Sequence, residues 1–219
     1  MSNLKKIVYL IVVLCFSSAI AGSYDDFFRA LRSDDARTLE ALFARGFDPN
    51  TVDPQGRSPL SLAFHYEAYE AARALVRQPD FRFDEPNAAG ETPLMLAALR
   101  GQWELARALL VRGARLDRPG WTPLHYAAAG PEPRVVQLLI GHGAALDARA
   151  PNGNTPLMMA ARYGSEAGAW MLLHAGADPR LRNDDGLTAA DFARSVERVK
   201  LARELERRAG ESDNVSESR

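Results

Sequence analysis

The chain has 219 residues, of which 47% are apolar and 25% are charged, and its formal net charge is −1. This composition is that of an ordinary folded domain and argues against a disordered chain. Because Lys and Arg are interspersed with Asp and Glu, the sequence provides no basic stripe, and we expect no nucleic-acid partner.

The first 21 residues have the organisation of a secretory signal peptide. Lys5 and Lys6 precede an apolar run at 7–16, and Ala19-Ile20-Ala21 supplies a small-residue cleavage site. The run has about 10 residues, whereas a bilayer span needs about 20. We therefore expect cleavage after Ala21, no membrane span in the mature chain, and a periplasmic location, with secretion from the cell as the alternative.

A short pattern recurs along the remaining residues. It consists of Gly, a variable residue, Ser or Thr, Pro and Leu. Its copies are Gly56–Leu60, Gly90–Leu94, Gly120–Leu124 and Gly153–Leu157, with a degenerate copy at Gly186–Ala190. The prolines are 34, 30 and 33 residues apart, and Ala189 follows after another 33. Ser or Thr before Pro is a helix-start signal, because the hydroxyl caps free N–H groups and Pro fits the first helical position.

A period of about 33 residues that carries Thr122-Pro-Leu-His-Tyr-Ala127 resembles the ankyrin repeat. The resemblance covers about 24–209 and implies an all-α solenoid of helix-turn-helix repeats joined by β-hairpin-like fingers. We divide a domain at 22–209 into an N-terminal cap at 23–55, repeats at 56–89, 90–119, 120–152 and 153–185, and a C-terminal cap at 186–209. The polar segment at 210–219 is predicted to be disordered.

The sequence offers no support for catalysis, a metal site or a cofactor. The only cysteine is Cys15, within the leader, and no two histidines lie three to five residues apart. For His125, the resemblance implies a structural hydrogen bond within its repeat. We therefore expect no catalytic residues, no bound metal and no cofactor, and predict that the protein is not an enzyme.

One finger departs from the pattern of the others. The segment 113–120 lacks three residues that the other fingers contain. We expect a notch there, with the large aromatic side chain of Trp121 at its edge.

The candidate site is the concave face, which the resemblance places on the finger tips and first helices. We predict partner-binding side chains at Arg57, His65, Tyr66, Glu91, Leu99, Arg100, Trp121, Asn154, Arg162 and Tyr163. Trp, Tyr and Arg dominate binding hot spots, so this set favours recognition of a protein.

We accordingly expect a monomeric protein-binding module of the bacterial exported type, whose partner the sequence does not identify. One version supports another periplasmic protein, such as a stress enzyme. The alternatives are an immunity protein that neutralises a toxin acting in the periplasm, and a structural protein that self-associates through its end faces.

Overall fold

The computed structural model describes residues 22–216, with side chains described through residue 211. These residues form helices joined by turns and contain no strand. They fall into two compact units that divide between Phe83 and Asp84. The predicted signal peptide, residues 1–21, lies outside the described residues.

The first unit contains a helix at 22–32, followed by α2 (Ala36–Ala44), α3 (Pro59–His65) and α4 (Tyr69–Val76). Its core is aromatic at the N-terminal end, where the Phe27 ring lies 5.0 Å from that of Phe28 and 4.8 Å from that of Phe47. Leu39 and Leu75 are fully buried. These apolar groups give the first repeat, which lacks the Thr-Pro-Leu start, a core of its own.

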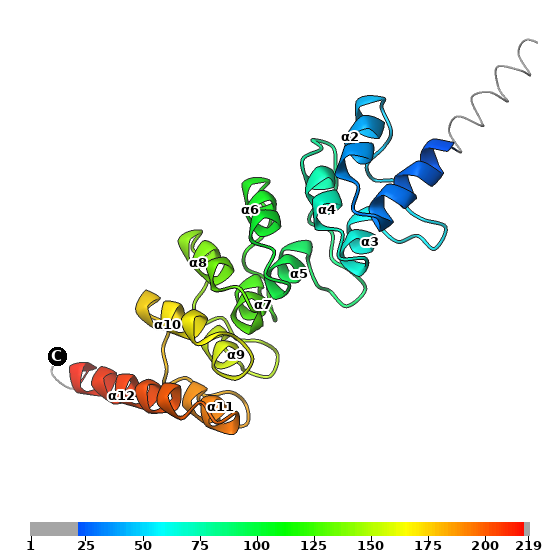
Figure 1. The fold of residues 1–219 in the computed structure, drawn as a ribbon. Coiled ribbons are helices and arrows are strands. Elements are labelled where there is room, and N and C mark those ends of the chain that lie inside the picture. Colours follow the sequence, from blue (N-terminus) through cyan, green and yellow to red (C-terminus); the bar gives the residue numbers. More distant parts are fainter. Residues whose placement is uncertain (1–21, 217–219) are drawn as a thin grey trace, which may run out of the picture. The chain divides into compact units, whose positions relative to one another are not determined.

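The second unit contains four helical hairpins. Their helices are α5 (Pro93–Leu99) and α6 (Trp103–Val111), α7 (Pro123–Ala129) and α8 (Pro133–Gly141), α9 (Pro156–Arg162) and α10 (Glu166–Ala175), and α11 (Ala189–Ser195) and α12 (Val199–Ser216). Helices α5, α7, α9 and α11 pack side by side in one row, here called the inner row (Figure 1). Helices α6, α8 and α10 form the outer row. The predicted all-α repeat fold is confirmed.

Helices α3 and α9, one in each unit, begin as the recurring motif predicts. The hydroxyls of Ser58 and Thr155 accept hydrogen bonds from the backbone N–H groups of Ser61 and Met158, and proline occupies the first helical position. At the other end of the hairpin, Gly176 follows α10 with φ +102°. Glycine adopts this left-handed conformation without the steric cost that a Cβ imposes.

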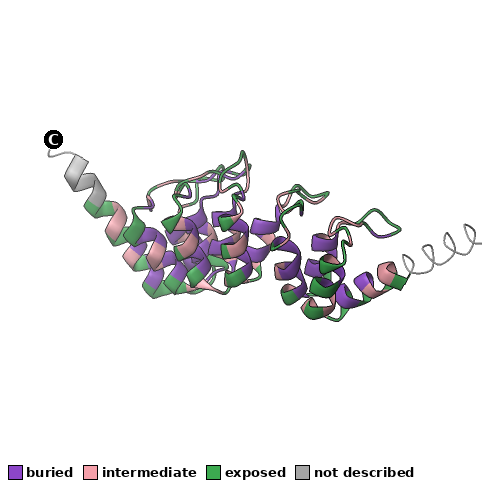
Figure 2. Ribbon diagram, turned by 90° about the horizontal axis from the view of Figure 1, so that it is seen from above, coloured by how far each residue is buried: buried purple, intermediate pink, exposed green. Residues whose placement is uncertain are grey.

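Small buried apolar residues on the inner row pack with larger ones on the outer row. Ala97, Ala127 and Ala160 on the inner row are buried, as are Leu109 and Leu139 on the outer row. Buried residues accordingly line the facing sides of the helices, whereas the exposed ones gather on fingers and outer surfaces (Figure 2). Each fully buried leucine stabilises the fold by about 1.5–3 kcal/mol relative to an exposed one.

The C-terminal helix extends beyond the cap expected at 186–209. Helix α12 runs from Val199 through Ser216. Arg207 forms ion pairs with Glu204 and Glu211, which lie three and four residues away on the same helix face. Such ion pairs stabilise a solvated helix. The polar composition of this helix is, by itself, also typical of a disordered segment.

Candidate functional site

An apolar cleft lies on the inner row of the second unit. It encloses about 200 Å³ and is lined by Leu99, Trp121, His125, Tyr126, Ala129 and Met159. His125 is buried, and the other five side chains are partly exposed. The cleft is smaller than the roughly 300–1,000 Å³ typical of small-molecule pockets, so its size suits one inserted side chain.

The cleft is hollow because of the residue that ends α7. Leu99, Ala129 and Arg162 are the last residues of three successive inner helices, α5, α7 and α9. Neighbouring packed helices lie about 8–10 Å apart, so the methyl group of Ala129 leaves a gap between two longer side chains. Met159, which lies one turn before the end of α9, forms the far wall.

Two aromatic rings fix the shape of the cleft. The Trp121 ring meets those of His125 and Tyr126 edge to face, at centroid distances of 5.4 and 6.5 Å. The Tyr126 hydroxyl donates a hydrogen bond of 3.1 Å to Glu91. Burial, together with the negative charge of Glu91, raises the pKa of Tyr126 to about 12, so the phenol stays neutral. Such edge-to-face pairs contribute about 0.5–1.5 kcal/mol beyond area burial, which holds Trp121 in place.

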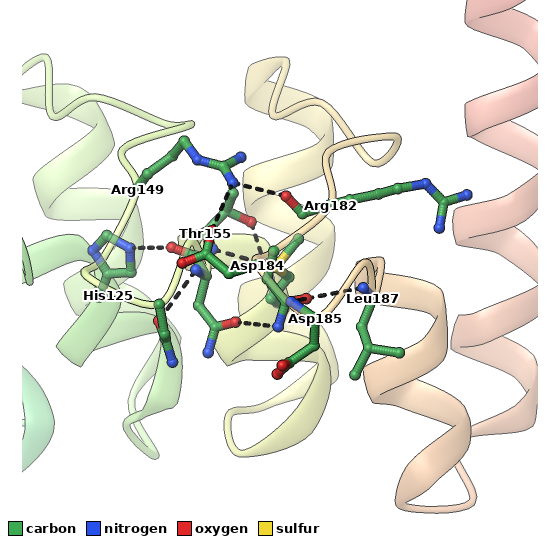
Figure 3. A network of polar contacts seen from close by, with 11 residues as sticks. His125, Arg149, Thr155, Arg182, Asp184, Asp185 and Leu187 are labelled. Carbon is green, nitrogen blue, oxygen red and sulfur yellow. Dashed lines mark hydrogen bonds and ion pairs between the residues drawn. The ribbon is translucent and has the colours of Figure 1, made fainter.

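His125 is the buried residue of the cleft lining. Its Nδ1 accepts a hydrogen bond from the Thr122 backbone N–H at 3.2 Å, and its Nε2 lies 3.0 Å from the backbone oxygen of Asn154 in the next repeat (Figure 3). These partners select the neutral form protonated on Nε2. Burial lowers the pKa of His125 below its ordinary value. The predicted structural role of His125 is thereby confirmed.

Asn154 is a correction to the predicted set. Its exposed fraction is only 7%, and its side-chain oxygen accepts a hydrogen bond of 2.9 Å from the Asn183 amide. Trp121 and Asn154 both stand directly before Thr-Pro in their repeats. Trp121 is partly exposed, but Asn154 is covered by the finger that carries Asn183. Asn154 therefore belongs to the polar network between repeats, not to the contact surface.

The remaining predicted residues of the second unit lie in or beside the cleft. Leu99 and Trp121 line it, and Glu91 holds Tyr126. Arg100 follows Leu99 on the exposed side, and Arg162 and Tyr163 are exposed one turn beyond Met159.

Sequence reasoning missed three lining residues, Tyr126, Ala129 and Met159. Tyr126 and Met159 both stand three positions after the proline of their repeats, and Ala129 stands six after it. That register could have been read from the spacing.

Arg57, His65 and Tyr66 belong to the first unit. Arg57 and Tyr66 line a second cleft of about 210 Å³, together with Tyr24, Phe28 and Gln55 among others. The Arg57 Nε donates to Asp53 at 2.6 Å. Burial opposes ionisation of Asp53, but hydrogen bonds from Arg57 outweigh it, so the pKa of Asp53 is lowered. The His65 ring packs edge to face on that of Tyr66 at 4.9 Å.

Comparison with known proteins explains the regular placement of these side chains. The family model for ankyrin repeats (three copies) matches residues 27–119 and 104–183. The chain belongs to the ankyrin-repeat family.

This ankyrin-repeat protein is similar to parts of much larger proteins. It is 36% identical over 174 residues to neurogenic locus notch homolog protein 1 of Danio rerio, a match covering 71% of the chain and 7% of that protein. It is 33% identical over 184 residues to human SH3 and multiple ankyrin repeat domains protein 2, covering 80% of the chain and 10% of that protein. The chain thus spans a small part of the curated relatives it matches.

Two properties of the described part of the ankyrin-repeat protein bear on its chemistry. Within side chains 22–211, no three His, Cys, Asp or Glu residues gather as a metal site would require. None of the helices described between residues 22 and 216 is both long and apolar enough to span a bilayer.

Proposed function

We propose that this ankyrin-repeat protein is a non-catalytic binding module that holds a partner protein on its inner helical row. Ankyrin repeats are protein-interaction modules and typically carry no catalytic groups. The observation that carries the proposal is the apolar cleft with partly exposed Trp121 and Tyr126 at its rim. Aromatic side chains held rigidly around a pocket are the usual centre of a binding hot spot.

The proposal extends to location and biological role. The charged, apolar and small-residue segments of residues 1–21 support export of the chain to the bacterial periplasm. There the protein acts as a monomer that supports another exported protein, such as a stress enzyme. Its cleft provides a preformed surface, which lowers the entropic cost of binding.

Replacement of Trp121 tests the binding surface. Trp121→Ala removes the rim of the cleft and should weaken partner binding by about 2 kcal/mol, as truncation of a hot-spot aromatic does. The partner is first identified by crosslinking in intact cells, and its affinity for each purified variant is then measured by calorimetry. The adduct is expected in the fraction released by osmotic shock.

Trp170→Ala is the matched control, because Trp170 is a partly exposed tryptophan on outer helix α10. It should leave partner affinity within about twofold of the original. Thermal unfolding of both variants separates binding from stability. An unchanged affinity in Trp121→Ala would exclude the cleft as the binding site, and an adduct confined to the cytoplasm would exclude export.

A further inference from the structure

Arg162, at the end of α9, is a cation held in place by aromatic rings. Its guanidinium carbon lies 5.3 Å from the centroid of the Tyr163 ring and 5.6 Å from that of Phe192 in the next inner helix. The side chain is exposed. Cation–π contacts of this kind fix the guanidinium through its faces and leave its N–H edge available for hydrogen bonding.

Arg162 differs from the neighbouring arginines in its ionic partners. Arg194 on α11 pairs with Asp191 and Glu206, and Arg207 on α12 pairs with Glu204. Among the residues whose side chains the structure describes, no carboxylate lies within 4.0 Å of the Arg162 guanidinium. Arg162 is thus an oriented cation on this surface, and no carboxylate between residues 22 and 211 neutralises its charge.

The position of Arg162 connects this cation to the cleft. Met159 forms one wall of the cleft, and Arg162 follows it by three residues on the same face of α9. Residues with this spacing have Cβ atoms about 5–6 Å apart. The opposite side of the cleft carries Glu91, whose carboxylate accepts hydrogen bonds from Tyr126 and Asn87. A ligand that fills the cleft therefore has a negative group on one side and a positive group on the other.

We propose that the partner presents an extended segment in which a large apolar side chain enters the cleft and an acidic side chain pairs with Arg162. The inference rests on the proposed function and specifies the partner's determinant. Side chains two residues apart in an extended segment share a face and are separated by about 6.6 Å. The acid should accordingly follow or precede the apolar residue by two positions, on the side that faces α9 and away from Glu91.

The bidentate geometry of guanidinium and carboxylate explains why an acid is preferred. Two parallel N–H···O hydrogen bonds match the planar edge of Arg162, which the two aromatic rings already orient. The side chain therefore loses little further freedom when it binds. Lysine at this position would keep the charge but would lose the planar fork and the stacking.

The test uses a library of random dodecapeptides displayed on phage, selected against the purified chain. The enriched peptides should share a Leu, Ile, Met, Phe or Trp with an Asp or Glu two positions away. Selection on Arg162→Gln should retain the apolar preference and lose the acidic one. Arg194→Gln is the matched control, since Arg194 is already paired, and it should return the same peptides as the original chain.

A double-mutant cycle then measures the pairing directly. The most enriched peptide is synthesised with its acid and with the corresponding amide. The amide should bind the original chain about tenfold more weakly, as expected for loss of a charge-assisted hydrogen bond. On Arg162→Gln the two peptides should bind equally. Arg162→Lys, which keeps the charge, should still prefer the acid.

Three results would overturn the inference: no shared peptide pattern, an acidic preference that survives in Arg162→Gln, or loss of the acidic preference in Arg194→Gln. Thermal unfolding of each variant confirms that the comparison is made between folded proteins. These outcomes are separate from the proposed function, which depends on the effect of Trp121→Ala on the crosslinked partner.

Discussion

Helix α9 packs against α7 on one side and α11 on the other, and different interactions hold the two junctions. Between α7 and α9 the contact is dry and close: buried His125 reaches the Asn154 backbone oxygen, and Gly164 lies directly against the Ala128 carbonyl. Between α9 and α11 the Arg198 guanidinium donates to the carbonyl oxygens of Ala160 and Ala161, at 3.0 and 3.3 Å.

The fingers on the α11 side are also joined by a charged donor. Arg149 donates to the Arg182 backbone oxygen at 2.8 Å and lies 3.7 Å from Asp184 (Figure 3). An internal repeat has neighbours on both sides that exclude water, whereas the last repeat has only one. Corresponding helix ends are therefore covered by close backbone approach inside the stack and bonded by a long charged donor near its end.

The largest effect is expected at the dry junction, in Gly164→Ala. A Cβ at this position would overlap the carbonyl oxygen of Ala128, and backbone atoms on both sides prevent an easy shift. The free energy of unfolding should fall by about 3 kcal/mol, the upper part of the usual range for overpacking. Urea denaturation measures it.

Gly141→Ala is the control, because Gly141 ends α8 with open space around it. It should raise the free energy of unfolding by about 0.5 kcal/mol. A Gly164→Ala protein as stable as the original would show that the dry junction is not tightly packed.

The polar junction is tested by Arg198→Met, which keeps much of the side-chain length but removes the donors. The Ala160 and Ala161 carbonyls lose a charged donor in a partly buried setting, so the free energy of unfolding should fall by about 1.5 kcal/mol. Added salt should weaken the original protein more than the variant, since only the original has this charged contact. Equal stability in urea titrations would contradict the assigned role of Arg198.

The smallest effect is expected for His125→Met, which places at the dry junction the residue type found in the equivalent position of the next repeat, Met158. The Asn154 oxygen keeps its hydrogen bond from the Ala150 N–H. The bond from the imidazole to Asn154 is lost, whereas the methionine sulfur can accept from the Thr122 N–H as Met158 does from the Thr155 N–H. The free energy of unfolding should therefore fall by about 1 kcal/mol at pH 7.5.

The pH dependence of the free energy of unfolding tests the role of His125 directly. Because its pKa is lowered in the folded state, the unfolded chain binds the proton first as the pH falls. The contribution of His125 to the free energy of unfolding should therefore be fully present above its unfolded pKa of about 6.5. Below that pH the contribution should decline, by at most about 1.4 kcal/mol per pH unit. Urea titrations between pH 7.5 and 5.5 should show this slope in the original protein and a flatter one in His125→Met. Identical slopes would assign the dependence elsewhere.

The repeat frame could be predicted from sequence because its signals are local. Thr or Ser before Pro sets the start of each inner helix, and Gly176 ends an outer one, whatever lies around them. Trp121 lines the cleft beside Ala129, whereas the notch expected from the shortened finger at 113–120 stays a prediction. The C-terminal end of the domain is harder to predict from sequence, because exposed helices and disordered segments share a polar composition.

The site was only partly predictable, because burial depends on the neighbouring repeat. Trp121 and Asn154 occupy the same position in their repeats, yet Asn154 is covered by a finger whose Asn183 amide reaches it. The hollow itself depends on the short side chain of Ala129, which ends at its methyl group. A hydrophobic pattern marks where apolar groups stand, but it does not show where an inter-repeat gap remains.

The small size of Ala129 also bears on how binding specificity can change in evolution. This residue ends its helix and is partly exposed, so a larger side chain there need not disturb the packed rows. Serine, valine or leucine at this one codon would make the hollow progressively shallower while the Thr-Pro-Leu-His frame stayed constant. Recognition can therefore diverge between descendants of this protein by single steps, each compatible with the inherited scaffold.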